Sequence, residues 1–215
     1  MTPWERRLER AAELAKRTPA AAELLGFYIA VEQASWPVLP QPERLRDLVA
    51  RAGPSLLAEA ARNRTEPAES FIARVLRQWE AQRAVGRALL PANLGTRNTC
   101  PFCGERPVVA VLRPEGEGGK RYLLCSLCLT EWEFRRMLCP NCGEENREKL
   151  PVYTTQQFPH IRVEACDSCR HYIKAVDLTV DGLAVPEVDE LSSVALDLWA
   201  AENGYTKVAS NLFEF

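Results

Sequence analysis

All eight cysteines of this 215-residue chain lie between residues 100 and 169. They form four Cys-x-x-Cys pairs, namely Cys100/Cys103, Cys125/Cys128, Cys139/Cys142 and Cys166/Cys169. In a reducing compartment such pairs indicate metal binding or redox chemistry rather than structural disulfides. A thioredoxin-type pair opens a helix after a parallel strand, and no pair here has that context. The pairs therefore predict metal sites.

The cysteine pairs belong to an internal repeat with a period of about 40 residues. The segments CPFCGE at 100–105 and CPNCGE at 139–144 agree at five of six positions. Each is followed by a strand-like stretch, a polar turn, a second strand and another pair, after gaps of 21 and 23 residues. Two such turns at the tips of neighbouring hairpins can close a tetrahedron of four sulfurs, and glycine after the second cysteine permits positive φ.

The four pairs can combine in three ways. Cross-braced pairing joins alternate pairs, and nested pairing joins the two inner pairs and the two outer pairs. The repeat favours sequential pairing because each duplicated unit has its own hairpin, although spacing alone leaves the other two open. Four thiolates suit zinc or iron, so we expect two metal ions, zinc or iron. Sequential pairing gives two sites, one of Cys100, Cys103, Cys125 and Cys128 and one of Cys139, Cys142, Cys166 and Cys169.

The rest of the chain predicts an α+β protein. Apolar residues at helical spacing, with Pro19 opening one helix and Gly53 ending another, indicate a helical front half. The cysteine-rich part reads as two tandem rubredoxin-like or zinc-ribbon modules, followed by a C-terminal helix. The expected domains are 1–97 (helical), 98–138 (first ribbon), 139–182 (second ribbon) and 183–215 (helix and tail), with a linker over 91–99.

Two finer expectations concern the C-terminal part. Residues 171–188 read as two short strands with a turn at Asp181-Gly182. Residues 189–204 read as one amphipathic helix with an apolar stripe of Leu191, Val194, Leu198 and Trp199.

Charge and composition narrow the classes of function. The formal net charge is −2, and eight thiolates with two divalent ions would add −8 + 4 = −4. That acidic balance weighs against a nucleic-acid-binding ribbon, which needs a positive surface. Only two histidines and no spare cysteine are present, so we expect no catalysis; His160 and His171 read as exposed strand residues. The N-terminal stretch lacks the apolar run of a secretory signal, which predicts a cytoplasmic protein.

The segments RYLLCSLCLTEWEFRRMLCPNCGEEN, VEACDSCRHYIKAVDL and LDLWAAENGYTKVASNLF resemble the formate dehydrogenase accessory protein family, FdhE. The resemblance covers about residues 98–213. It implies a cytoplasmic accessory factor that is needed for active formate dehydrogenase, a molybdenum or tungsten enzyme, and that acts on its catalytic subunit. It also implies that the eight cysteines bind iron or zinc in a rubredoxin-like fold. Four further positions match the motif between the sites: Thr130, Glu131, Trp132 and Arg136.

The segment after the second pair is the candidate partner surface. Alternation places Trp132, Phe134 and Arg136 on one face of a strand. The two aromatic side chains are expected to fill the seam between the ribbons. The alternative hypothesis is that Arg135, Arg136 and an exposed edge of Trp132 contact the formate dehydrogenase catalytic subunit. Competing functions for the whole chain are a zinc-ribbon module that binds nucleic acid or a transcription complex, and a rubredoxin-like electron carrier.

Overall fold

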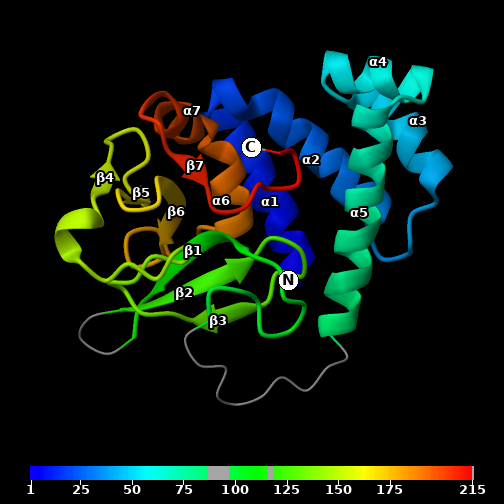
Figure 1. Ribbon diagram of the computed structural model, residues 1–215. Helices are drawn as coiled ribbons and strands as arrows, with labels where there is room; N and C mark the ends of the chain where they lie inside the picture. The colour runs from blue at the N-terminus through cyan, green and yellow to red at the C-terminus, as the bar shows by residue number, and fades with distance from the viewer. Residues whose placement is uncertain (87–96, 116–118, 215) are drawn as a thin grey trace. The chain divides into compact units, whose positions relative to one another are not determined.

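A computed structural model describes residues 1–86, 97–115 and 119–214. The chain forms two compact units, residues 1–87 and 88–215, which are considered one at a time (Figure 1). The expected linker at 91–99 falls mostly outside the described residues. The expected division of the second unit at 138/139 and 182/183 stays a prediction.

The first unit is helical, as the sequence indicates. Its first helix begins with a capping box, in which Thr2 accepts from the Glu5 backbone N–H and the Glu5 side chain accepts from the Thr2 backbone N–H. No described helix is long and apolar enough to cross a membrane. The helices are α1 (Pro3–Arg17), a 3₁₀ turn (Pro19–Ala21), α2 (Ala22–Ser35), α3 (Pro42–Ala52), α4 (Ser55–Asn63) and α5 (Glu66–Val85).

Apolar side chains spaced three and four residues apart form the core of this helical unit. Leu25 and Phe27 of α2, Leu45 of α3 and Phe71 of α5 are all buried. The rings of Phe27 and Phe71 stack with centroids 5.5 Å apart. These residues have packing roles, and the chemistry-bearing residues lie in the second unit.

The second unit contains one seven-stranded sheet within the described residues, in the order β3-β2-β1-β6-β5-β4, with β7 paired to β6. Its strands are β1 (Pro107–Arg113), β2 (Lys120–Cys125), β3 (Glu131–Glu133), β4 (Val152–Thr154), β5 (Ile161–Cys166), β6 (His171–Asp177) and β7 (Thr206–Lys207). A 3₁₀ turn (Arg147–Lys149) precedes β4.

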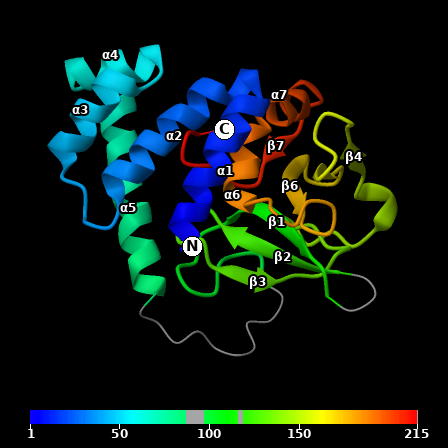
Figure 2. The same ribbon diagram turned by 180° about the vertical axis from the view of Figure 1, so that it is seen from behind.

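The sheet topology shows the sequence repeat in three dimensions. The strands β1, β2 and β3 form one antiparallel meander, and β4, β5 and β6 form another. In each, two strands lie between the cysteine pairs and the third follows the second pair. The meanders meet where β1 pairs with β6 in parallel, from Val109 opposite Lys174 to Leu112 opposite Asp177 (Figure 2). The two modules therefore share one continuous sheet.

The C-terminal helix that the sequence suggests is two short helices, α6 (Pro186–Ser192) and α7 (Val194–Glu202). The break falls at Ser193, whose φ of −101° and ψ of 33° are not helical. Its hydroxyl donates to the carbonyl oxygens of Asp189 and Glu190, which is how serine competes with helix geometry. The expected stripe is also wrong at Leu198, whose side chain is exposed.

The expected second strand after β6 is also absent among the described residues. Residues 178–185 form turns instead. The carboxylates of Asp177 and Asp181 each accept a hydrogen bond from the backbone N–H two residues further on. Such local bonds hold the chain in a turn rather than in a sheet.

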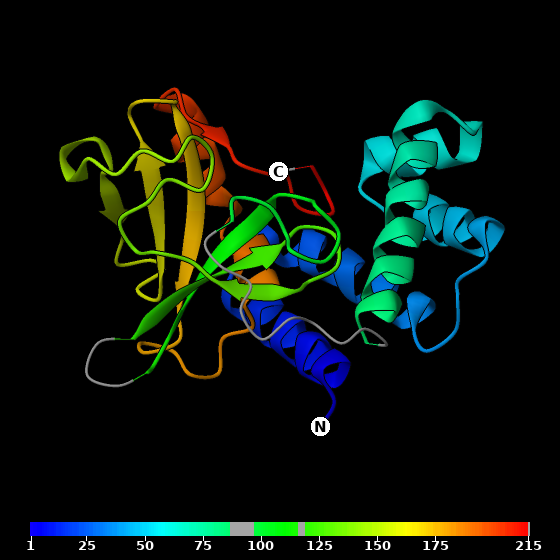
Figure 3. The same cartoon turned by 60° about the horizontal axis from the view of Figure 1, so that its bottom comes forward.

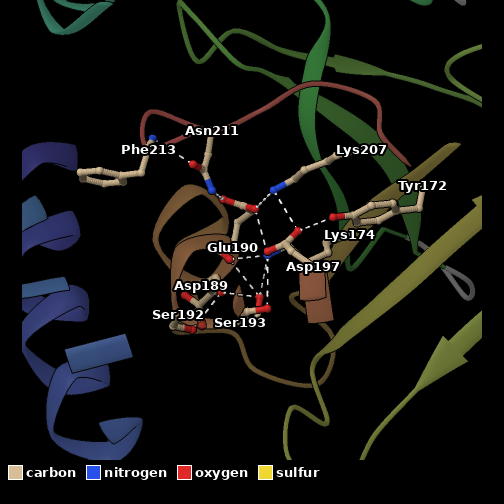
Figure 4. Close-up of polar contacts among 10 residues, drawn as sticks. All are labelled: Tyr172, Lys174, Asp189, Glu190, Ser192, Ser193, Asp197, Lys207, Asn211 and Phe213. Atoms are coloured by element: carbon tan, nitrogen blue, oxygen red, sulfur yellow. Dashed lines mark hydrogen bonds and ion pairs between the residues drawn. The ribbon is translucent and has the colours of Figure 1, made fainter. Parts of the chain in front are cut away.

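The helix α6 packs against β1 and β6, and α7 shares an apolar core with β5 and β6 (Figure 3). A buried ion network joins them (Figure 4). The Lys174 ammonium of β6 donates to Asp197 at 2.6 Å and lies 2.9 Å from Glu190 Oε1, while Lys207 of β7 pairs with both carboxylates. Two lysines and two carboxylates balance, so no buried charge is left uncompensated. The network ties the helices after β6 to the sheet that carries the cysteines.

Candidate metal centres

The sulfurs of the first repeat unit lie together. Cys100 Sγ is 3.5 Å from Cys128 Sγ, and Cys103 Sγ is 3.4 Å from Cys125 Sγ and 3.5 Å from Cys128 Sγ. These four sulfurs all lie within 4.8 Å of one another. All four cysteines are free thiols, so no disulfide competes with a metal ion.

The sulfurs of the second unit form an equivalent group. Cys139 Sγ is 3.8 Å from Cys169 Sγ, and Cys142 Sγ is 3.7 Å from Cys166 Sγ. A zinc–sulfur bond of about 2.3 Å gives a sulfur tetrahedron with edges of about 3.8 Å. The second group has that separation, and the first group is a few tenths of an ångström tighter. Each group could hold one metal ion, and the grouping is the sequential one.

The turns that present the sulfurs share one backbone feature. In every pair the residue after the second cysteine has positive φ: Gly104 (81°), Leu129 (56°), Gly143 (78°) and Arg170 (56°). This left-handed geometry was expected at the two glycines. Leucine and arginine adopt it as well, although a side chain there costs about 1–2 kcal/mol. The positive φ of Leu129 and Arg170 could have been predicted from the sequence, because both residues occupy the same position after a Cys-x-x-Cys pair as the two glycines.

Polar hydrogens point at the sulfurs. The backbone N–H groups of Phe102, Leu127 and Asn141 each donate to the first cysteine of their pair at 3.4 Å. The buried Thr130 hydroxyl lies 3.0 Å from Cys128 Sγ. Such groups offset the negative charge of thiolates, and they tune the affinity of a metal site.

The thiols of the first group hydrogen-bond with one another, and this shifts the pKa of Cys100 and the pKa of Cys125 in opposite directions. Hydrogen bonds from Cys125 and Cys128 lower the pKa of Cys100. The pKa of Cys125 is raised by its hydrogen bonds with Cys100 and Cys128 and by burial. The negative charge is therefore favoured on Cys100 over Cys125, and a divalent cation would allow all four thiols to ionise.

The two groups differ in exposure. Cys100, Cys125 and Cys128 are buried, and Cys103 is half-buried. In the second group Cys142 is exposed and Cys169 is half-buried. The first site is thus shielded from solvent on most sides, whereas the second can be approached.

The residues of the motif between the two sites differ in burial and in their hydrogen-bond partners. Glu131 pairs with Arg113 through two hydrogen bonds of 2.5 and 2.7 Å. Trp132 is only 1% exposed, and its indole N–H donates to the Arg97 carbonyl. The hypothesis of an exposed edge of Trp132 is therefore wrong, because both its ring and its polar atom are buried. Arg135 pairs with Glu145 at the surface.

The two modules are also joined by polar side chains that the sequence did not single out. The buried Arg121 of β2 donates to Glu164 of β5, and Arg162 donates to the same carboxylate. The pKa of Glu164 is lowered, because these two guanidinium groups outweigh the effect of burial. Near the first turns, Arg106 donates to Asn141 at 2.7 Å. Periodicity could not reveal the Arg121–Glu164 and Arg106–Asn141 pairs, because the partners lie 43 and 35 residues apart in the sequence.

Neither histidine lies in a cysteine group. His171 places Nδ1 2.8 Å from the Cys169 carbonyl oxygen. His160 was expected to be exposed, and this expectation is wrong: its side chain is only 12% exposed and lies 2.8 Å from Asp189. The Asp181 carboxylate is also close, because the side-chain ligand atoms of His160, Asp181 and Asp189 all lie within 4.8 Å of one another.

Comparisons with known proteins agree with this arrangement. Two domain models, described as "FdhE, central domain" and "FdhE, C-terminal domain", match residues 99–136 and 137–213. A "Protein FdhE homolog" of Aquifex aeolicus is 41% identical over 120 residues, which is 55% of this chain and 42% of the relative. One of Pseudomonas aeruginosa is 38% identical over 122 residues, covering 54% and 40%. The sequence matches thus span about two fifths of these relatives.

A solved structure is similar over nearly the whole chain. The crystal structure of the FdhE protein from Pseudomonas aeruginosa aligns with a TM-score of 0.72 at 26% identity, covering 98% of this chain and 95% of that one. The two domain models together match more than half of the 215 residues and include all eight cysteines. The chain therefore belongs to the FdhE family.

Proposed function

We propose that this protein is an accessory factor for the maturation of formate dehydrogenase, which binds the catalytic subunit of that enzyme and carries two metal ions. The observation that supports the proposal most is the pair of four-cysteine groups on one shared sheet, in a chain of the FdhE family. The protein is proposed to act by binding rather than by catalysis, and to do so in the cytoplasm.

The metal ions would have an architectural task. Each would hold two turns at the tips of one meander, and the two meanders share the β1–β6 pair. Binding energy at such a site becomes folding energy when the site does not exist in the unfolded chain. All eight cysteines are proposed ligands, with zinc or iron as the ion. Iron at the more exposed second site would additionally provide a one-electron centre.

The proposed contact with the client lies on the segment after β3. Arg135 and Arg136 are exposed there, whereas Trp132 holds the segment in place from beneath. Exposed arginines are common at interfaces because a guanidinium can form several hydrogen bonds with one partner.

The test uses the full chain, purified without oxygen, and the purified catalytic subunit of formate dehydrogenase from the same organism. Binding of the chain to the catalytic subunit is measured by biolayer interferometry. Metal content is measured on the same sample by native mass spectrometry of the intact protein. We expect a complex and two metal ions per chain. The mass of the bound ions distinguishes iron from zinc, and a ferric thiolate spectrum that appears when the sample is mildly oxidised would confirm iron.

Variants of the cysteine groups and complementation in cells extend this test. Serine in place of one cysteine group is expected to remove one metal ion and to abolish client binding. Loss of formate dehydrogenase activity in cells without the gene should be restored by the wild-type chain. A well-folded, metal-loaded chain that neither binds the subunit nor restores activity would overturn the proposal.

A further inference from the structure

The second unit contains a cavity of about 330 Å³ beside the second cysteine group. Cys139 and Cys166 are among the residues that line it. The volume falls at the lower end of the range for ligand pockets, and it suffices for one or two large side chains. Neither the metal sites nor the ion network under α6 and α7 accounts for this space.

The walls of the cavity are largely apolar. Leu138, Leu150 and Ile173 contribute to the lining, together with Val152 and Met137. Val152 is 52% exposed and Met137 is 41% exposed, so the apolar surface continues from the cavity onto the protein surface. An occupant would thus be larger than a small molecule that fills the cavity alone.

The polar lining is positively charged. Arg121 and Arg162 share the single carboxylate of Glu164, which leaves one positive charge. Arg136 adds a second, and it forms no hydrogen bond or ion pair with any part of the chain that the structure describes. The protein as a whole is acidic, with a net charge of −2. The positive charge in the cavity therefore requires a specific explanation.

The charges also give the cavity a direction. Arg162 and Cys166 lie on the same face of β5 and four residues apart, so about 13 Å separates their Cα atoms. A divalent ion with four thiolates would carry −2, at the cysteine end. An anionic group is therefore favoured at the guanidinium end and disfavoured near the sulfurs.

The strand beside the cavity offers backbone partners. β4 is an outer strand of the sheet, and all three of its residues are exposed. Among the described residues its one strand partner is β5. An outer strand presents free N–H and C=O groups, and these are what an extended peptide uses when it adds to a sheet.

We propose that this cavity binds an extended segment of the client polypeptide, with an apolar side chain inside and an acidic side chain at Arg136 and Arg162. The inference rests on the proposed function, since the client is the formate dehydrogenase catalytic subunit. Arg136 lines the cavity and contacts the client there, whereas its neighbour Arg135 pairs with Glu145 outside the cavity.

Two matched pairs of variants test this assignment against the purified catalytic subunit. Arg136→Ala is compared with Arg147→Ala, because Arg147 is also exposed but does not line the cavity. Val152→Glu at the rim is compared with Leu198→Glu on α7, where the exposed fraction is 60% against 52% for Val152. We expect dissociation constants at least tenfold higher for the two cavity variants and less than twofold higher for the two controls. Full metal content in all four shows that folding is intact.

A second arm uses the protein alone, so that it is independent of the client. A fluorescein-labelled peptide of alternating leucine and glutamate is expected to bind the wild type and to bind Arg136→Ala at least tenfold more weakly. A leucine–lysine peptide is the control, and it should not bind.

The outcomes are distinguishable from failure of the proposed function. If the wild type binds the subunit and the cavity variants bind it equally well, the inference is overturned and the proposed function stands. If octanoate binds in the cavity and the acidic peptide does not, the occupant is a small amphiphilic acid, which also overturns the inference. If the peptide binds as predicted but the subunit does not, the proposed function and the client assignment fail together.

Discussion

The Thr130 hydroxyl lies 3.0 Å from Cys128 Sγ, two residues further along the same chain turn. Thr130 is buried, so water does not replace this contact. Because a donor to a coordinating sulfur stabilises the thiolate, Thr130→Val should lower the metal affinity of the first site about 10–100-fold. Competition with a chromophoric chelator measures this change.

The second site and an exposed threonine provide the controls for that measurement. Affinity at the second site should remain at the wild-type value, since Thr130 contacts only the first group. Thr154→Val, on the exposed strand β4, should leave both affinities unchanged. Equal weakening of both sites by Thr130→Val would show a general loss of folding and contradict the local role.

Backbone strain gives a second prediction. Gly143 has a φ of 78°, and a Cβ built there meets nothing within 4 Å. Gly143→Ala should therefore destabilise the metal-loaded protein by about 1–2 kcal/mol through backbone conformation alone. Gly182→Ala, in a turn without positive φ, should change stability by less than half as much. Denaturant unfolding of both variants tests this, and equal effects would argue against the left-handed requirement.

The buried ion network gives a prediction for acid pH. Burial favours the neutral form of Glu190, but Lys174 and Lys207 outweigh burial and lower its pKa to about 2. The unfolded value is about 4.3. A lowered folded-state pKa means that the stabilisation is complete above the unfolded value and is lost as pH falls from about 4.3 towards 2.

Glu190→Gln should consequently destabilise the protein at pH 7 by about 3–5 kcal/mol, since it leaves buried lysines uncompensated. The difference in unfolding free energy from the wild type should shrink between pH 5 and pH 3. Both proteins carry the same cysteine sites, so acid release of metal cancels in this difference. Glu133→Gln, at an exposed carboxylate, is the control and should show no such trend. A difference that stays constant down to pH 3 would contradict the lowered pKa.

The sequence was sufficient for the repeating part of the molecule. The CPxCGE repeat and the nearly equal gaps predicted two hairpins with one cysteine group each, and the structure places four sulfurs together in each unit. This worked because hairpins and paired cysteines are local features, whose spacing is visible along the chain. Family membership also followed from these segments.

Features that depend on distant contacts were not predictable in the same way. The parallel β1–β6 pair joins strands more than 60 residues apart, and it leaves no trace in the periodicity of either strand. Ser193 breaks the expected C-terminal helix because its hydroxyl bonds to the backbone, and Lys174 from β6 reaches the same break. Leu198 fits an apolar stripe by spacing, yet it faces solvent once the helix is divided.

The most direct test of the central claim, that each repeat unit encloses its own metal ion, is native mass spectrometry of serine variants. The wild type should carry two ions. Replacing Cys100, Cys103, Cys125 and Cys128 should leave one ion bound, whereas replacing Cys125, Cys128, Cys139 and Cys142 should leave none. One ion retained by the second variant and none by the first would contradict the account, as would a folded, reduced wild type without metal.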